Sequence, residues 1–229
     1  MKDEALRLAR EQDTLAAIVY LTRQTDMLAA AKAFSEAMLH LYWQEKNLSL
    51  ALAFGRAGAQ FALTAAEANP QLASDLRSSA KAMTYNLASF TWPGWDEPGI
   101  EISPADVQLG LDAAKTNLRL AIELQKGDLP LSRAHWMLAA QQLAVQSFFD
   151  ATESFAQAAA FATAANAPEE ALLARGFISV VKIVAASAES HERAAATAEL
   201  DELKSQLRQL PDGDAFCSQF DGAIKVFAK

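Results

Sequence analysis

Apolar side chains recur three and four positions apart along most of this chain. Phe177, Val180, Val181 and Val184 keep this spacing in a segment that is otherwise rich in β-branched residues. A strand would instead alternate apolar and polar side chains every two residues. Alanine, leucine, glutamine and glutamate, which all favour helices, surround these stripes. The pattern therefore predicts an all-α protein.

Capping signals divide the helical pattern into segments. Asn69 is a residue type that caps helices, and Pro70 follows it where a first helical residue would stand. Ser103 and Asp106 have the spacing of a capping box. Gly127 is expected to adopt the left-handed conformation that ends a helix.

These signals delimit about ten helices. The one long irregular segment, residues 91–103, reads TWPGWDEPGIEIS. We predict a single domain over residues 1–229, with a first helical block at 1–90 and a second at 104–229. The predicted helices span residues 3–22, 25–45, 47–68, 70–90, 104–126, 130–147, 149–166, 168–187, 190–209 and 213–228.

Several predicted helices carry a small residue, a large apolar one four positions on and a small one three further. Small residues allow two helices to approach closely, and the large one fills the groove between them. Glycines inside predicted helices, where each costs ~1 kcal/mol relative to alanine, indicate the same close packing. The clearest triplets are Ala30, Phe34 and Ala37, and Ala151, Phe155 and Ala158; the glycines are Gly55, Gly58, Gly110 and Gly176.

The triplet spacing resembles the second helix of a tetratricopeptide repeat. Leu138 and Ala139 resemble the first helix of such a repeat and lie twelve residues before Ala151, which is the family's offset. The helix pairs recur at roughly 40 to 45 residues here, whereas the family period is ~34. The resemblance implies a right-handed array of stacked antiparallel helical hairpins, whose concave face in the family mostly holds peptides or partner proteins.

Charge and cysteine content narrow the range of partners. The net charge is −8 and the isoelectric point about 4.9, which disfavours binding to nucleic acid or to an anionic membrane surface. Cys217 is the single cysteine, so neither an intrachain disulfide nor a thiolate metal site can form. The sequence shows no signal peptide and no run of about 18 apolar residues. We expect a soluble, cytoplasmic protein.

The irregular segment contains the most distinctive local residues. Trp92, Trp95, Asp96 and Glu97 stand among proline and glycine residues that restrict and bend the backbone. They could form an aromatic and acidic finger that contacts a ligand or partner, because tryptophan is favoured at interface hot spots. They could equally fold back over the junction of the two blocks, because a long irregular connection must be held in place.

Histidine and aromatic residues stand together in two further helices. His40 with Tyr42, and His135 with Trp136, could line a pocket, although successive helical residues point in different directions. The three histidines have no zinc-ligand spacing, and no Glu-x-x-His motif occurs. The sequence therefore predicts no metal ion and no cofactor.

The sequence also offers no catalytic constellation. It lacks a Gly-x-Ser-x-Gly elbow, and Cys217 stands among phenylalanines, as a small core residue would. The leading hypothesis is a non-catalytic protein- or peptide-binding module that acts as a scaffold or adaptor. The alternative is a small-molecule-binding or enzymatic helical protein with a pocket between the two blocks, lined by the aromatic residues and histidines named above. A homodimer that buries the apparent groove is a third reading.

Overall fold

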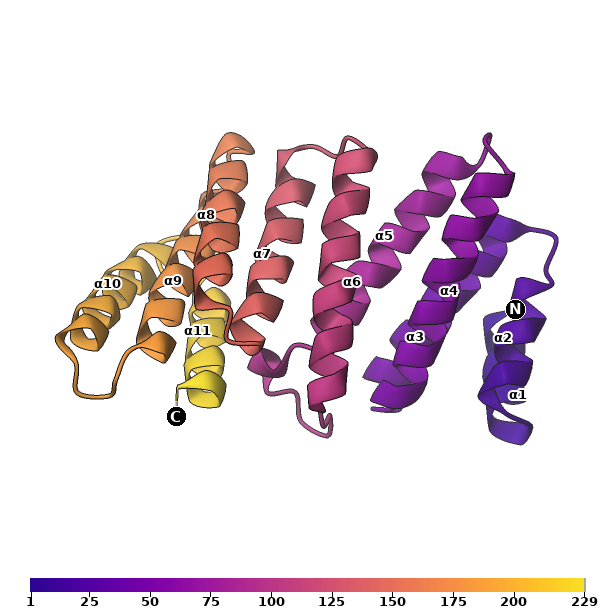
Figure 1. The fold of residues 1–229 in the computed structure, drawn as a ribbon, viewed down its shortest axis with the longest axis horizontal. Helices are drawn as coiled ribbons and strands as arrows, with labels where there is room; N and C mark the ends of the chain where they lie inside the picture. The colour runs from indigo at the N-terminus through magenta and orange to yellow at the C-terminus, as the bar shows by residue number, and fades with distance from the viewer. Residues whose placement is uncertain (229) are drawn as a thin grey trace. The chain divides into compact units, whose positions relative to one another are not determined.

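The computed structural model describes residues 1–228 and contains, among them, eleven α-helices, one short 3-10 helix and no strand (Figure 1). The prediction of an all-α protein is confirmed. The elements are α1 (Lys2–Glu11), α2 (Thr14–Thr22), α3 (Met27–Trp43), α4 (Leu48–Ala68), α5 (Ala73–Phe90), η1 (Pro93–Trp95), α6 (Pro104–Glu123), α7 (Asp128–Ala144), α8 (Phe148–Ala164), α9 (Pro168–Ala185), α10 (His191–Leu207) and α11 (Gly213–Phe227).

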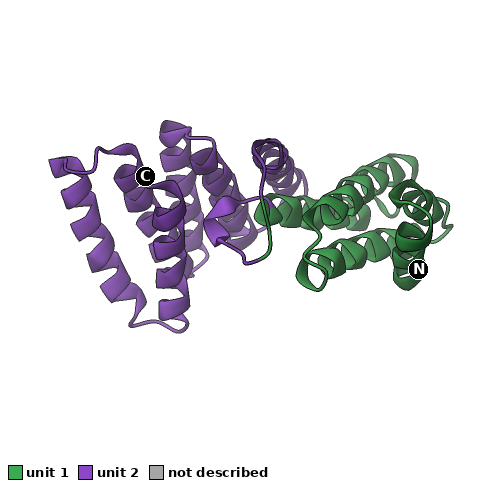
Figure 2. Ribbon diagram, turned by 90° about the horizontal axis from the view of Figure 1, so that it is seen from below, with its two compact units in different colours: residues 1–90, 99–101 green, residues 91–98, 102–229 purple. Residues whose placement is uncertain are grey.

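The chain forms two compact units, which Figure 2 distinguishes by colour. Unit 1 consists of Met1–Phe90 and Gly99–Glu101. Unit 2 consists of Thr91–Pro98 and the described residues from Ile102 to Ala228. The irregular segment therefore does not belong to one block, because its tryptophan-containing half packs within unit 2 and its following turn within unit 1.

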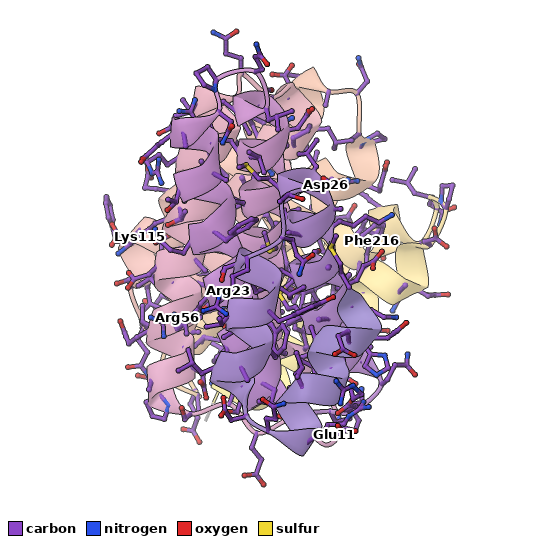
Figure 3. The ribbon with its side chains drawn as sticks, turned by 90° about the vertical axis from the view of Figure 1, so that its right-hand side faces the viewer. Glu11, Arg23, Asp26, Arg56, Lys115 and Phe216 are labelled. Atoms are coloured by element: carbon purple, nitrogen blue, oxygen red, sulfur yellow. The ribbon has the colours of Figure 1, made fainter. Side chains whose placement is uncertain are left out.

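Consecutive helices of unit 1 pack as antiparallel hairpins, α1 on α2, α3 on α4 and α4 on α5. A Cβ atom at Gly55 would lie 2.6 Å from the sulfur of Met38, and one at Gly58 would lie 2.6 Å from Cβ of Phe34. These glycines therefore allow the close approach of helices that the sequence indicated. Figure 3 looks onto the N-terminal end of this unit, where Glu11 is the last residue of α1.

Unit 2 continues the hairpin pattern from α6 to α10, each helix packing against the next. Three of its helices begin twenty residues apart, at Asp128, Phe148 and Pro168. The helices α6, α7 and α8 each end in a turn of the same type. A residue in the left-handed conformation is followed by a residue whose N–H donates a hydrogen bond to a carbonyl of the last helical turn. The left-handed residues are Gln125, Gln146 and Asn166, and the returning bonds run from Lys126 to Ala121, Ser147 to Gln142 and Ala167 to Ala162, at 2.9–3.0 Å. This is the Schellman ending, and it fixes the geometry of each hairpin.

The last helix, α11, departs from this order, because it contacts α9 and η1 as well as its sequence neighbour α10. Gly176 on α9 lies directly under α11, where a Cβ atom would overlap the ring of Phe220. Gly110 on α6 is equally confined, because a Cβ atom there would overlap the side chains of Thr91 and Gln141. The close-packing interpretation of the two glycines is confirmed.

Three details of the sequence-based prediction are wrong. The helix expected over residues 3–22 is two helices, because the carboxylate of Asp13 accepts the N–H of Ala16 at 2.7 Å and starts a new helix. Asn69 ends α4 instead of starting the next helix, since its side-chain amide bonds the carbonyl of Ala65 at 3.0 Å. Gly127 has a φ of −64° and is the N-cap of α7, while Gln125 takes the left-handed conformation. The capping box of Ser103 and Asp106 is confirmed.

Candidate functional site

The C-terminal end of α3 in unit 1 exposes a tryptophan. The buried stripe of α3 runs through Phe34, Ala37 and Leu41, at helical spacing. Trp43 falls outside this stripe and is 49% exposed, whereas the adjacent Tyr42 is 2% exposed. Exposed tryptophans are uncommon, because the large apolar ring is more stable when buried.

Two aromatic contacts hold Trp43 in place. Tyr42 stacks on Phe90 with ring centroids 3.7 Å apart and an interplanar angle of 3°. Trp43 meets both rings edge-on, at 4.8 Å from Tyr42 and 6.0 Å from Phe90. The arrangement fixes one edge of the indole against the core and leaves the remainder in solvent. A ring that is held in place loses little conformational entropy when it binds.

A charged residue of the α3–α4 turn lies against the indole. Lys46 adopts a φ of 50°, and its ammonium nitrogen lies 5.4 Å from the ring centroid of Trp43, within cation–π range. Glu45 accepts a hydrogen bond from Arg10, and Nε2 of His40 lies 3.1 Å from Oε1 of Glu45. The turn therefore holds a cation against one exposed aromatic ring, next to a carboxylate that Arg10 already binds.

A pocket of about 520 Å³ opens beside this turn, within unit 1. Three of its lining residues, Glu45, Gly99 and Glu101, are solvent-exposed. The complete lining comprises Glu45, Lys46, Asn47, Leu48, Gly99, Ile100 and Glu101. We call Trp43 together with this lining the Trp43 surface.

The tryptophans of the irregular segment occupy a different place, in the core of unit 2. Trp92 has no exposed surface, and its ring lies 4.7 Å from Trp95 and 5.6 Å from Trp136, centroid to centroid. Trp136 is 8% exposed and also packs edge-on against Phe177, at 5.1 Å. The structure thus brings three of the candidate residues together as one aromatic cluster, in which Trp92 has no surface to offer a partner.

The remaining candidates do not form one site. Asp96 is exposed and forms an ion pair with Lys225 of α11. Glu97 is half-buried. His135 stacks on Phe161, with ring centroids 5.4 Å apart, and burial lowers the pKa of its imidazole below the ordinary value. Of the sequence-based candidates, His40 and Tyr42 lie at the Trp43 surface.

Sequence reasoning passed over Trp43 in favour of its neighbours. A helical signal was available, because Lys32, Glu36 and Trp43 lie on the side of α3 opposite its alanine-rich stripe. Tyr42 lies on the buried side of α3 and was nevertheless chosen as the candidate. A tryptophan in phase with charged residues is expected to be exposed.

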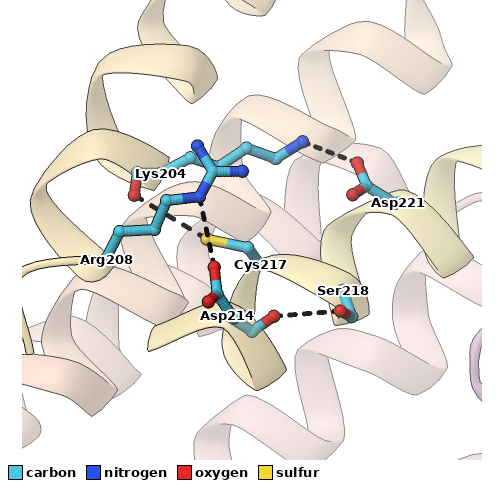
Figure 4. A network of polar contacts seen from close by, with 6 residues as sticks. All are labelled: Lys204, Arg208, Asp214, Cys217, Ser218 and Asp221. Atoms are coloured by element: carbon cyan, nitrogen blue, oxygen red, sulfur yellow. Dashed lines mark hydrogen bonds and ion pairs between the residues drawn. The ribbon is translucent and has the colours of Figure 1, made fainter. Parts of the chain in front are cut away.

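A metal-binding cluster and an accessible thiol are two kinds of reactive group that could perform chemistry. Among residues 1–228, no three side chains of His, Cys, Asp or Glu gather closely enough to hold a metal ion. The thiol of Cys217 is buried between α10 and α11, where its sulfur lies 3.7 Å from the carbonyl of Lys204 (Figure 4). Burial raises the pKa of this thiol, which disfavours the nucleophilic thiolate.

None of the helices over residues 1–228 is both long enough and apolar enough to cross a membrane. No protein-family model, no curated protein sequence and no solved structure matches this chain.

Proposed function

We propose that this chain is a non-catalytic protein- or peptide-binding module, and that the Trp43 surface is its contact site. The exposure of Trp43 carries the proposal. A tryptophan that is half-exposed, held by two rings and approached by the ammonium group of Lys46 has the features of an interface hot spot. Partners of such hot spots bury the ring and satisfy the charged rim around it.

The hairpin architecture supports the same proposal. Three successive helices of unit 2, α7, α8 and α9, begin at a regular interval, and we propose that the architecture is tetratricopeptide-like. Stacked hairpins of that kind serve mainly to hold peptides or partner proteins. The single buried cysteine fits the cytoplasmic compartment that we propose for the protein.

A small-molecule ligand is the second candidate, and the pocket beside Trp43 favours it. Its volume of about 520 Å³ lies in the range of ligand sites. Its lining is mostly charged or polar, however, and Leu48 and Ile100 are its only large apolar side chains. Drug-sized ligands are bound mainly by apolar walls, so we place this candidate second.

The test compares three purified proteins, wild type, Trp43→Ala and Phe149→Ala, in their affinity capture of protein or peptide partners. Phe149 is 78% exposed and lies in unit 2, so its variant controls for the loss of any exposed aromatic ring. We expect Trp43→Ala to weaken the binding of a captured partner at least tenfold, equivalent to about 1.4 kcal/mol, and Phe149→Ala to retain it.

Circular dichroism shows whether each variant is folded. A partner that binds all three proteins equally would contradict the assignment of the site. If a small metabolite displaces the partner, and Trp43→Ala no longer binds that metabolite, the result would favour a small-molecule ligand.

A further inference from the structure

The C-terminal helix α11 is held mainly by segments that are distant from it in sequence. Its buried stripe consists of Cys217, Phe220 and Ala223. Besides its neighbour α10, the helix packs against α9 and η1, which precede α11 by some 30 and 120 residues of chain. The helix therefore packs into unit 2 largely through segments other than the one that precedes it in the chain.

One contact works as a ring in a notch. Phe220 is fully buried, and its ring centroid lies 5.1 Å from that of Phe177. Gly176 provides the space, since any side chain there would overlap the ring. The fit selects an aromatic residue on the incoming helix and a glycine on α9.

A second set of contacts lies within the next two turns of α11. The ring of Phe227 lies 6.1 Å from that of Trp92. Lys225 forms an ion pair with Asp96. A Cβ atom at Gly222 would lie 3.2 Å from the carbonyl oxygen of Gly94, so the helix passes close to the backbone of η1. We call Gly176, Phe177, Trp92, Gly94 and Asp96 the α11 seat.

The connection to α10 is short and constrained. Residues 208–212 join the two helices, and Asp212 has a left-handed φ of 58°. Gly213 has no room for a side chain, because a Cβ atom would overlap the carbonyl of Leu207. Three polar contacts join α11 to α10 and its C-terminal end (Figure 4): Lys204 with Asp221 at 2.6 Å, Arg208 with Asp214 at 3.4 Å, and the thiol of Cys217 with the carbonyl of Lys204 at 3.7 Å. Of these, the pair of Arg208 and Asp214 is fully on the surface, where ion pairs contribute little to stability.

We propose that the α11 seat also binds the α11 helix of a second copy of this chain, so that two chains associate by exchanging their C-terminal helices. The second copy is the occupant because its helix makes every contact that α11 makes within one chain. Exchange therefore changes only the conformation of residues 208–212, and opening a short, constrained connection favours it. This association uses unit 2 and is independent of the Trp43 surface.

Two complementary variants of the full chain test the exchange. Gly176→Leu fills the notch and leaves α11 unchanged, whereas Phe220→Ala removes the ring and leaves the seat unchanged. Each variant alone is mismatched. In a mixture, exchange creates one native pair and one pair in which the larger side chain at position 176 faces the space that the ring has vacated. The double variant Gly176→Leu/Phe220→Ala is the matched control, because it repairs the fit within one chain.

We expect the mixture to form a heterodimer of twice the 24.7 kDa chain mass, measured by native mass spectrometry and light scattering, at concentrations where each variant alone is monomeric. The mixture should also melt at a higher temperature than either parent. A mixture that shows only monomers, with a melting profile equal to the sum of the two parents, would overturn the proposal.

If either core variant fails to fold, a surface pair decides. Asp96→Lys and Lys225→Glu each place like charges at the end of the seat, and both positions are at least half-exposed, so folding is preserved. Helix exchange between the two variants restores an opposite-charge pair at both seats. Heterodimers in excess of the statistical half of all dimers support the exchange, and an absence of dimers or a statistical ratio overturns it.

Discussion

His135 shows how one partly buried side chain makes stability depend on pH. Its ring stacks on Phe161, and burial holds the pKa of the imidazole below its ordinary value of about 6.5. The unfolded chain therefore binds a proton more readily than the folded chain does once the pH falls below that value. The stabilising contribution is complete above about pH 6.5 and is lost as the pH falls towards the lowered pKa.

We expect the free energy of unfolding of the wild type to decrease between about pH 7 and pH 5, and that of His135→Phe to decrease less steeply. The phenylalanine keeps an aromatic ring against Phe161 and cannot take up a proton. Urea unfolding at pH 5, 6 and 7 measures both slopes. Parallel slopes for the two proteins would show that His135 does not contribute.

At the scale of an element, the endings of α6, α7 and α8 have an unusual composition. Gln125, Gln146 and Asn166 occupy the left-handed position that glycine usually fills in a Schellman ending. The left-handed conformation costs a residue with a side chain roughly 1–2 kcal/mol. The glycine available nearby, Gly127, is used as an N-cap instead.

Gln146→Gly is therefore expected to stabilise the protein by about 1 kcal/mol, because it relieves the left-handed strain without removing a contact of the core. Gly127→Ser is the control. It should leave stability unchanged or slightly raised, since serine is a better N-cap and no atom lies within 4 Å of the position its Cβ would take. Chemical denaturation measures both, and a loss of stability in Gly127→Ser would mean that the glycine, not Gln125, is the residue that needs the left-handed conformation.

The elements also show which features a single sequence can predict. Apolar periodicity was sufficient for the helices α3 to α11, because each buries a stripe several turns long. It could not reveal the break before α2, which depends on one carboxylate, that of Asp13, competing for a backbone N–H. Which residue takes the left-handed conformation depends on where the preceding helix ends. Two positions separate Gln125, which takes this conformation, from Gly127, which was predicted to take it. Trp43 was missed for a similar reason, because it is the residue directly after Tyr42 on α3. Tyr42 is buried and Trp43 is exposed.

At the scale of the whole molecule, the division into two units changes the interpretation of the irregular segment. Its first half, Thr91–Pro98, belongs to unit 2, where Trp92 contacts rings of α7, α9 and α11. Such a residue joins three helices that are far apart in sequence, so its removal acts on the unit as a whole. The second half, Gly99–Glu101, belongs to unit 1 and lines the pocket beside Trp43.

Trp92→Ala is expected to destabilise unit 2 by about 3–5 kcal/mol, the usual cost of removing a large buried aromatic ring. Hydrogen exchange followed by mass spectrometry should show faster exchange in peptides from residues 104–227 and unchanged exchange in peptides from residues 1–90, because all the aromatic contacts of Trp92 lie within unit 2. Trp43→Ala provides the contrast, since a half-exposed ring contributes far less to the core and its loss should leave unit 2 unaffected. Faster exchange throughout the chain in Trp92→Ala would instead mean that the two units unfold together, as the single domain predicted from the sequence would.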